Sequence, residues 1–208
     1  MAGRMFLTDR RLQALMRRAK AEYARGGRSH DWSHVRRVWG YAVRLSREER
    51  ANPDVVVPAA VLHDLGRGKG RSHSGVLPRR LLRKAGFRGH LSERILACVA
   101  EHSTFSRERP ATPEARVLFD ADKLDSLGAV GVARFFMFAG ENRWDLRSAL
   151  VEAERRMRAL EGKGFCTAEG ARMGRMKAEY ARRFFEALEK EVGGGGALAY
   201  QAEAERRK

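Results

Sequence analysis

The sequence is poor in cysteine, in long apolar runs and in acidic residues. Only Cys98 and Cys166 occur among its 208 residues, too few for a disulfide framework, which favours a reducing compartment. The longest apolar runs, such as residues 55–62, fall far short of the roughly 20 residues that a membrane span needs. The start of the chain, MAGRMFLTDRR, has no apolar stretch followed by a small-residue cleavage site and so does not resemble a signal peptide. These absences predict a soluble, cytoplasmic protein with no membrane partner.

The shortage of acidic residues leaves a large positive charge. The chain has 26 Asp and Glu against 42 Lys and Arg, which gives a formal net charge of +16. Hydrophobic residues make up 43% of the chain, enough for a sizeable core, and this composition argues against disorder over most of its length. A charge of this size predicts an anionic partner, either a nucleic acid or a small anionic substrate on a generally basic surface.

Apolar residues recur at helical spacing almost throughout the chain. A buried parallel strand is the rival interpretation of residues 55–62, but no strand patterns follow to complete a sheet. The fold class is therefore all-α, with one compact multi-helix domain at residues 1–192 and a Gly-rich linker with a mobile tail at residues 193–208. Gly128 and Gly131 are expected to interrupt the helical pattern. The predicted helices lie near residues 12–19, 31–45 (with Asp31 as N-cap), 53–64, 77–84, 91–102, 114–127, 132–139, 145–160 and 168–192.

Histidines beside carboxylates are the most informative polar residues. His63 and Asp64 are adjacent ligand types at the end of an apolar helix, where Leu65-Gly66 lets the backbone adjust so that both reach one ion. His34 lies on the apolar side of its helix, where it must be satisfied by hydrogen bonds or by a metal. His30, four residues earlier, either chelates the same ion or acts from the helix entrance. For His63, a core histidine hydrogen-bonded to its neighbour is the alternative.

Three carboxylates within six residues mark a second segment, at residues 120–125. Its other residues are largely apolar, and carboxylates are costly to bury unless they are paired or coordinated. Asp122 and Asp125 share a helix face at a spacing of three, whereas Asp120 points elsewhere. A solvated helix start, where carboxylates suit the helix dipole, is the alternative interpretation.

Taken together, the order His34, then His63-Asp64, then Asp122 resembles the H…HD…D signature of the HD superfamily of metal-dependent phosphohydrolases. The matching segments look like the helix of the first ligand, the HD helix and the segment of the last ligand in small single-domain prokaryotic members. The resemblance extends over residues 25–190. Its segments are HDWSHVRRVW at residues 30–39, AAVLHDLG at residues 59–66 and DADKLDSLGAVGVAR at residues 120–134.

The resemblance implies an all-α fold whose metal is bound by His34, His63, Asp64 and Asp122. Independently, imidazole with carboxylate suits Mn²⁺, Fe²⁺, Co²⁺, Ni²⁺ or Zn²⁺, whereas Mg²⁺ prefers oxygen ligands and is kept as an alternative. Four protein ligands leave room for water on a six-coordinate ion, and such a water acts as the hydroxide nucleophile toward phosphorus.

Two further histidines bear on the number of metal ions. Branches of the family that bind two metals have extra histidines at places that look similar to His73 and His102, with Asp64 bridging the ions. The alternative is that His73 and His102 contact the substrate phosphate or protonate the leaving group. The resemblance therefore implies one or two ions.

Basic residues near these ligands predict an anionic substrate. Arg67, Lys69 and Arg71 alternate with glycines directly after the HD pair, so the backbone can approach an anion while the side chains supply positive charge. A solvated basic loop is the alternative for this segment. The predicted substrate-binding residues are Arg67, Lys69, Arg71 and Lys123. The predicted catalytic residues are Asp64, Lys69, Lys123, Asp125 and His102, the last two as candidates for proton transfer.

We therefore expect a metal-dependent phosphohydrolase, either a phosphomonoesterase or a phosphodiesterase, that acts on a nucleotide or a related small phosphate ester. A di-iron oxygenase of the HD type is the second hypothesis. A nucleic-acid-binding protein with a vestigial site is the third, which the net charge favours and the complete ligand set opposes. The sequence carries no signal for an oligomeric state.

Overall fold

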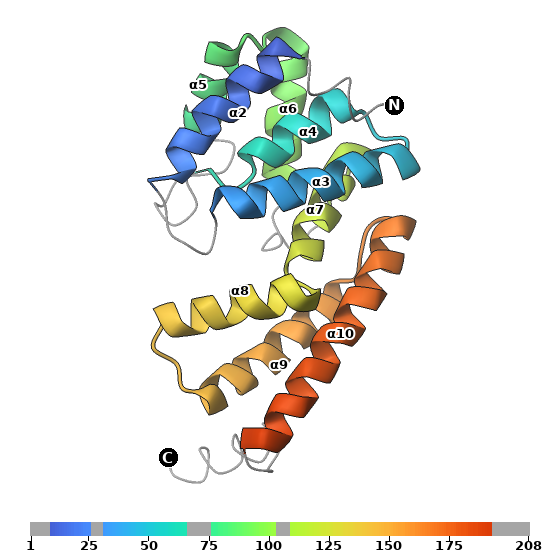
Figure 1. Ribbon diagram of the computed structural model, residues 1–208. Helices are drawn as coiled ribbons and strands as arrows, with labels where there is room; N and C mark the ends of the chain where they lie inside the picture. Colours follow the sequence, from blue (N-terminus) through green and yellow to red (C-terminus); the bar gives the residue numbers. More distant parts are fainter. Residues whose placement is uncertain (1–8, 26–30, 66–75, 103–108, 193–208) are drawn as a thin grey trace. The chain divides into compact units, whose positions relative to one another are not determined.

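Every regular element in the part of the chain that the structure describes is an α-helix (Figure 1). The computed structural model describes residues 9–25, 31–65, 76–102 and 109–192. This confirms the all-α prediction, and each predicted helix has a counterpart. The helices are α2 (Arg10–Tyr23), α3 (Trp32–Glu48), α4 (Pro53–Leu62), α5 (Val76–Ala85), α6 (Gly89–Glu101), α7 (Pro113–Asp125), α8 (Gly128–Glu141), α9 (Leu146–Lys163) and α10 (Ala168–Val192).

Helices α3 and α4 carry two of the histidines that the sequence singles out, and each begins at a side-chain cap. The carboxylate of Asp31 accepts a hydrogen bond from the backbone N–H of His34 at 3.0 Å, which confirms the predicted N-cap. The side chain of Asn52 does the same for α4 by accepting from the N–H of Asp54 at 2.9 Å. Residues 55–62 of α4 are all buried, so this helix is surrounded by protein rather than lying at the surface.

Helices α2 to α6 form one unit of the chain, together with α7 as far as Asp122 and with residues 166–170. Helix α4 lies at the centre of this unit, where it contacts α2, α3 and α6. Helix α5 packs on α2 and α6. Because α4 is apolar on nearly every side, its neighbours supply the apolar stripes that enclose it.

Of the described residues, the second unit contains 123–165 and 171–192. Its described helices share an aromatic cluster, in which Phe135 of α8 lies edge-on to Phe185 of α10 at 5.7 Å between ring centroids. The guanidinium of Arg156, on α9, lies 4.5 Å from the centroid of the Phe138 ring. The predicted domain end at residue 192 stays a prediction, and the predicted tail at residues 193–208 lies outside the described residues.

Two glycines at the start of α8 behave differently from each other. Gly128 has a φ of 72°, a conformation that favours glycine, and α8 begins there. Gly131 was expected to interrupt the helix, but it lies inside α8. A Cβ at this position would lie 2.3 Å from the carbonyl oxygen of Ser126, so glycine is needed for a close approach of the chain rather than for a break.

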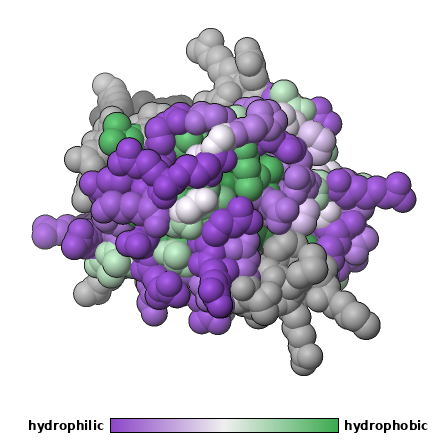
Figure 2. Space-filling view, turned by 90° about the horizontal axis from the view of Figure 1, so that it is seen from above, coloured by the Kyte–Doolittle hydropathy of each residue, from purple (hydrophilic) through white to green (hydrophobic). Residues whose placement is uncertain are grey.

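Among the described helices, none combines the length and the apolar character that crossing a bilayer requires. The face drawn in Figure 2 is mostly hydrophilic, with apolar residues visible between the polar ones. This surface agrees with the excess of charged residues in the sequence.

Candidate metal centre

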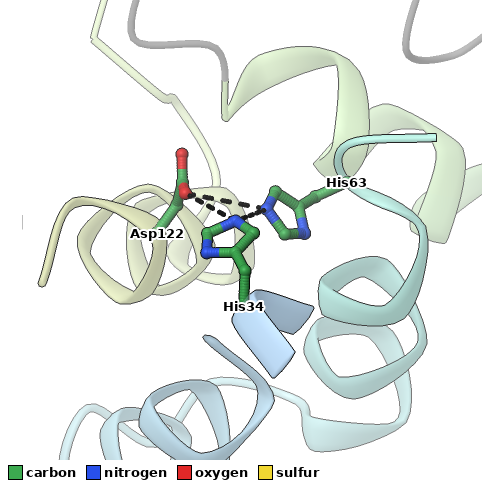
Figure 3. A group of neighbouring side chains, drawn as sticks. All are labelled: His34, His63 and Asp122. Carbon is green, nitrogen blue, oxygen red and sulfur yellow. Dashed lines mark hydrogen bonds and ion pairs between the residues drawn. The ribbon is translucent and has the colours of Figure 1, made fainter. Parts of the chain in front are cut away.

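Three helices of the first unit bring His34, His63 and Asp122 together. His34 lies in the first turn of α3, His63 directly follows α4, and Asp122 lies near the end of α7. Figure 3 shows the two imidazole rings and the carboxylate pointing toward one another. All three side chains are buried, so the polar atoms that face one another are shielded from solvent. Buried polar groups of this kind need a partner, and here they provide one another with it.

The donor atoms of these residues are spaced as the ligands of one metal ion would be. His34 Nε2 lies 3.1 Å from His63 Nε2. Asp122 Oδ1 lies 3.5 Å from His34 Nε2 and 3.6 Å from His63 Nε2. Two ligands that each lie about 2.1 Å from an ion are separated by about 3.0 to 3.5 Å in octahedral or tetrahedral coordination. The observed spacings match this range closely, and the donor set therefore fits a divalent ion.

Asp64 brings a second carboxylate to the same point. Its Oδ2 lies 3.2 Å from His34 Nε2 and 3.4 Å from His63 Nε2. The backbone N–H of Asp64 donates to the hydroxyl of Tyr23 at 3.3 Å, which links the turn after α4 to α2. The structure thus brings all four predicted ligands together, while their role in binding a metal stays a prediction. Tyr23 was missed, because in the sequence it continues the apolar face of α2 and carries no other signal.

Backbone carbonyl groups orient the two histidines that end their helices. His63 Nδ1 donates to the carbonyl oxygen of Ala60 at 2.8 Å, so the lone pair of the neutral ring is on Nε2, the nitrogen that faces His34 and Asp122. His102, which follows α6, makes the same kind of bond from Nδ1 to the carbonyl oxygen of Val99 at 2.5 Å. Its ring lies edge-on to that of His63, with 5.4 Å between centroids. His102 therefore belongs to the same cluster.

Burial and neighbouring charges shift the pKa values of His63, Asp122 and His102. Burial lowers the pKa of His63, but the charge of Asp64 and the hydrogen bond and charge of Asp122 outweigh it, and the pKa rises to about 9. Burial opposes ionisation of Asp122, yet the hydrogen bond and charge of His63 hold the pKa of this carboxyl well below its usual range. Burial, and then the charge of His63, lower the pKa of His102 to about 4. Near neutral pH, His63 is therefore cationic and His102 is neutral.

We expect the affinity for divalent metal to rise with pH. A metal ion and a proton compete for the lone pair of His63 Nε2, because Nδ1 already donates to Ala60. With a pKa of about 9 for His63, the apparent affinity should increase about tenfold per pH unit below that value and level off above it. Calorimetric titration with Mn²⁺ in buffers of different ionisation heat measures both the affinity and the proton released. An affinity that does not change between about pH 6 and pH 8 would contradict this competition.

Asp120 is a buried carboxylate whose two oxygens both accept hydrogen bonds from the protein. One of its oxygens accepts from the N–H of Cys166 at 2.8 Å, and the other accepts from the N–H of Thr167 at 2.8 Å and from its hydroxyl at 2.6 Å. Asp120 thus fixes the residues that lead into α10, as expected for a side chain that points away from Asp122. All three carboxylates of residues 120–125 are buried, which excludes a solvated helix start.

Lys123 and Asp125 belong to the second unit and are buried there. Lys123 Nζ donates to the carbonyl oxygen of Gly164 and lies 4.8 Å from the centroid of the Phe165 ring. Asp125 Oδ2 accepts from the guanidinium of Arg134 at 2.6 Å. Their predicted roles in phosphate binding and proton transfer stay predictions. Five further residues singled out in the sequence lie outside the described residues, namely His30, Arg67, Lys69, Arg71 and His73.

Comparison with known proteins places this cluster inside a recognised domain. Residues 31–127 match the HD domain family, a range that includes all four predicted ligands. YpgQ of Bacillus subtilis is 34% identical over 118 residues, which cover 53% of this chain and 58% of YpgQ, less than two thirds of that relative. The crystal structure of YpgQ in complex with ADP matches with a TM-score of 0.71 at 26% identity, over 88% of this chain and 98% of that one.

A second solved structure agrees in fold. An HD-superfamily hydrolase from Bacillus thuringiensis matches with a TM-score of 0.71 at 24% identity, over 88% of this chain and 97% of that one.

Proposed function

We propose that this chain, whose residues 31–127 match the HD domain family, is a metal-dependent phosphohydrolase acting on a nucleotide or a related small phosphate ester. The observation that carries the proposal is the convergence of His34, His63 and Asp122, whose donor atoms all lie within 4.8 Å of one another in a buried cluster. The two imidazoles and the carboxylate come from three different helices, so their meeting is a product of the fold and not of local sequence.

The chemistry of this donor set suits phosphate ester hydrolysis. His34, His63, Asp64 and Asp122 would hold a divalent ion, which would supply a water of lowered pKa and positive charge beside a phosphoryl oxygen. The two carboxylates would balance the two positive charges of such an ion. The backbone carbonyl that holds His63 Nδ1 keeps the ring from rotating away from the ion.

His102 has a distinct role in this proposal. Its pKa of about 4 makes it a poor proton donor near neutral pH. The hydrogen bond from Nδ1 to Val99 leaves Nε2 as the nitrogen that can accept a proton or bind an ion. We keep His102 as a candidate for proton transfer or as a ligand to a second ion through this nitrogen.

Two observations support a nucleotide as substrate. YpgQ has been crystallised in complex with ADP, and it shares the fold over most of both chains. The net charge of +16 attracts polyanions to this protein from a distance and raises the rate at which they reach it. In the proposal, Arg67, Lys69 and Arg71 hold the phosphate groups, as the sequence predicts.

The proposal is tested by a substrate panel run metal by metal. Phosphate release is measured with phosphomonoesters, phosphodiesters and nucleoside mono-, di- and triphosphates, each with Mn²⁺, Fe²⁺, Co²⁺, Ni²⁺, Zn²⁺ or Mg²⁺. We expect turnover of at least one nucleotide with a transition metal, and its loss on adding EDTA. Oxygen consumption by the iron-loaded protein would instead identify an HD-type oxygenase. A protein that binds metal stoichiometrically yet hydrolyses no phosphate ester would contradict the proposal.

A further inference from the structure

Most of the net positive charge lies on two helices of the first unit. Residues 10–25 (α2 and the two residues after it) and residues 76–88 (α5 and the three residues after it) contain eleven Lys and Arg together but only one acidic residue, Glu22. Eleven minus one gives +10 for these two segments, which leaves +6 of the total +16 for the rest of the chain. We call the side chains of these eleven cations the α2–α5 basic surface.

The two helices are neighbours and run antiparallel. Helix α2 contacts α5, and Figure 1 shows them against each other. The guanidinium of Arg11, at the start of α2, lies 5.2 Å from the centroid of the Phe87 ring, just after α5. Glu22, near the end of α2, pairs with Arg80, in the middle of α5, at 3.8 Å. Cations that are about 60 residues apart in sequence thus share one region of the surface.

Helix geometry directs these cations to solvent. Successive residues of a helix are rotated by about 100°, which places the cations of α2 on the half opposite Leu12, Leu15 and Ala19, which face the core. In α5 the cations lie opposite the buried pair Leu81 and Leu82. The face in Figure 2, seen from above the view of Figure 1, is correspondingly rich in hydrophilic side chains.

Most of these cations have no carboxylate partner within the protein. Arg11, Arg25, Arg79 and Arg80 form ion pairs with carboxylates. The other seven have no carboxylate oxygen within 4.0 Å among the residues that the structure describes, and Arg88 instead donates to the carbonyl oxygen of Arg83. Like charges held close together repel one another, so this surface is most stable when an external anion binds to it. The remaining six cations are Arg10, Arg17, Arg18, Lys20, Arg83 and Lys84.

We propose that the α2–α5 basic surface binds the phosphodiester backbone of a nucleic acid. Helix α2 has 14 residues and is therefore about 21 Å long, a length over which a duplex carries about twelve phosphates. This number is comparable to the net charge of +10 on the surface. Nine of the eleven cations are arginines, whose planar guanidinium binds phosphate through two hydrogen bonds.

An anionic membrane is the competing polyanion, and the surface fits it less well. A helix that lies in a lipid interface needs exposed apolar residues beside its cations. Of the large hydrophobic side chains that are exposed in the described residues, only Val76 lies on α2 or α5. The surface therefore offers charge without an apolar face to insert. It also uses none of His34, His63, Asp64 and Asp122, so nucleic-acid binding does not depend on metal chemistry.

The proposal is tested by fluorescence anisotropy of the full chain with labelled duplex DNA and, separately, labelled duplex RNA of about 20 base pairs. EDTA in the buffer removes contacts between phosphate and bound metal. If all seven cations without a carboxylate partner contact phosphates, the logarithm of the association constant should fall with the logarithm of salt concentration with a slope of about −6. The probe that binds more tightly identifies DNA or RNA as the ligand. A slope near zero for both probes would overturn the proposal.

Two quadruple variants separate the surface from the charge of the whole protein. Both lose four exposed cations without carboxylate partners in the described structure, so their net charge is the same. The test variant is Arg17→Gln, Arg18→Gln, Arg83→Gln and Lys84→Gln. The control variant is Arg36→Gln, Arg47→Gln, Arg175→Gln and Lys190→Gln.

The two variants are expected to behave differently. The test variant should make the slope less steep by about 4 and weaken binding at least about a hundredfold at low salt, whereas the control should stay within about threefold of wild type. Equal losses in both variants would mean that only the total charge matters and would overturn the proposal. Binding to phosphatidylserine vesicles without binding to either duplex would overturn it as well. If the test variant melts early, Arg17→Gln with Arg18→Gln alone replaces it, with half the expected change in slope.

Discussion

The Asp64→Asn variant is expected to lose divalent metal binding and about a thousandfold of the metal-dependent turnover. Asn has the shape of Asp, so the substitution removes a charge without opening a cavity. The removed charge lies 3.2 Å and 3.4 Å from the two imidazole nitrogens that face the site. The remaining carboxylate, Asp122, would then offset only one of the two charges of a divalent ion.

This prediction has a readout that does not depend on identifying the substrate. Metal at a hundredfold excess over its dissociation constant should stabilise the wild-type protein by about 2.7 kcal/mol, which raises its melting temperature. The Asp64→Asn protein should show no such rise, and calorimetric titration should show no saturable heat. Asp54→Asn is the matched control, because Asp54 is an exposed carboxylate in the first turn of α4, the helix that precedes Asp64. If Asp64→Asn binds metal as wild type does, Asp64 is not a ligand.

The Asp120→Ala variant is expected to lower the free energy of unfolding by about 3 to 5 kcal/mol. The carboxylate of Asp120 is fully buried and accepts three hydrogen bonds from Cys166 and Thr167. Alanine leaves two backbone N–H groups and a hydroxyl without this acceptor, and each such loss costs about 1 to 3 kcal/mol. Urea denaturation measures the change. Because the carboxylate of Asp120 holds Cys166 and Thr167 and is not one of the four predicted metal ligands, the folded variant should still bind metal.

The same contact can be disrupted from the opposite side. A Cβ at Gly170 would lie 2.3 Å from Asp120 Oδ2 and 2.6 Å from the Thr167 hydroxyl, so Gly170→Ala should also destabilise the protein strongly. Gly40→Ala is the matched control, because a Cβ at that helical position would meet no atom within 4 Å beyond the adjacent backbone of its own helix. It should leave stability unchanged or raise it by up to about 1 kcal/mol. Equal effects of the two glycine variants would show that the contact at Asp120 does not matter.

The helices were predictable because each buries one apolar face, which leaves a periodic trace in the sequence. The predicted range 168–192 coincides with α10, and Asp31 caps α3 as its position before the apolar pattern indicates. Gly131 was mispredicted because glycine has more than one structural use. In the sequence it indicates a break, whereas in the fold it makes room for the carbonyl of Ser126.

The candidate metal ligands were predictable from residue type and order, since His34, His63, Asp64 and Asp122 match a known pattern. The hydrogen-bond partners of Asp120 and Asp64 were not predictable. Asp120 bonds to residues 46 and 47 positions later, and Tyr23 contacts a backbone group 41 positions later. Such contacts leave no local pattern. The α2–α5 basic surface could not be predicted for the same reason, because the basic segments of α2 and α5 form one surface only when the two helices pack together.

The burial of α4 has a consequence for how long the candidate site persists. His63 and Asp64 directly follow helix α4, whose residues 55–62 are all buried. Segments with this degree of burial open only when their whole folding unit opens, whereas exposed helix ends fray locally. Transient fraying at the surface therefore leaves the spacing of the donor atoms intact. We expect the geometry of the site to be lost in the same cooperative event that unfolds the first unit. The site should therefore persist as long as the unit that contains it stays folded.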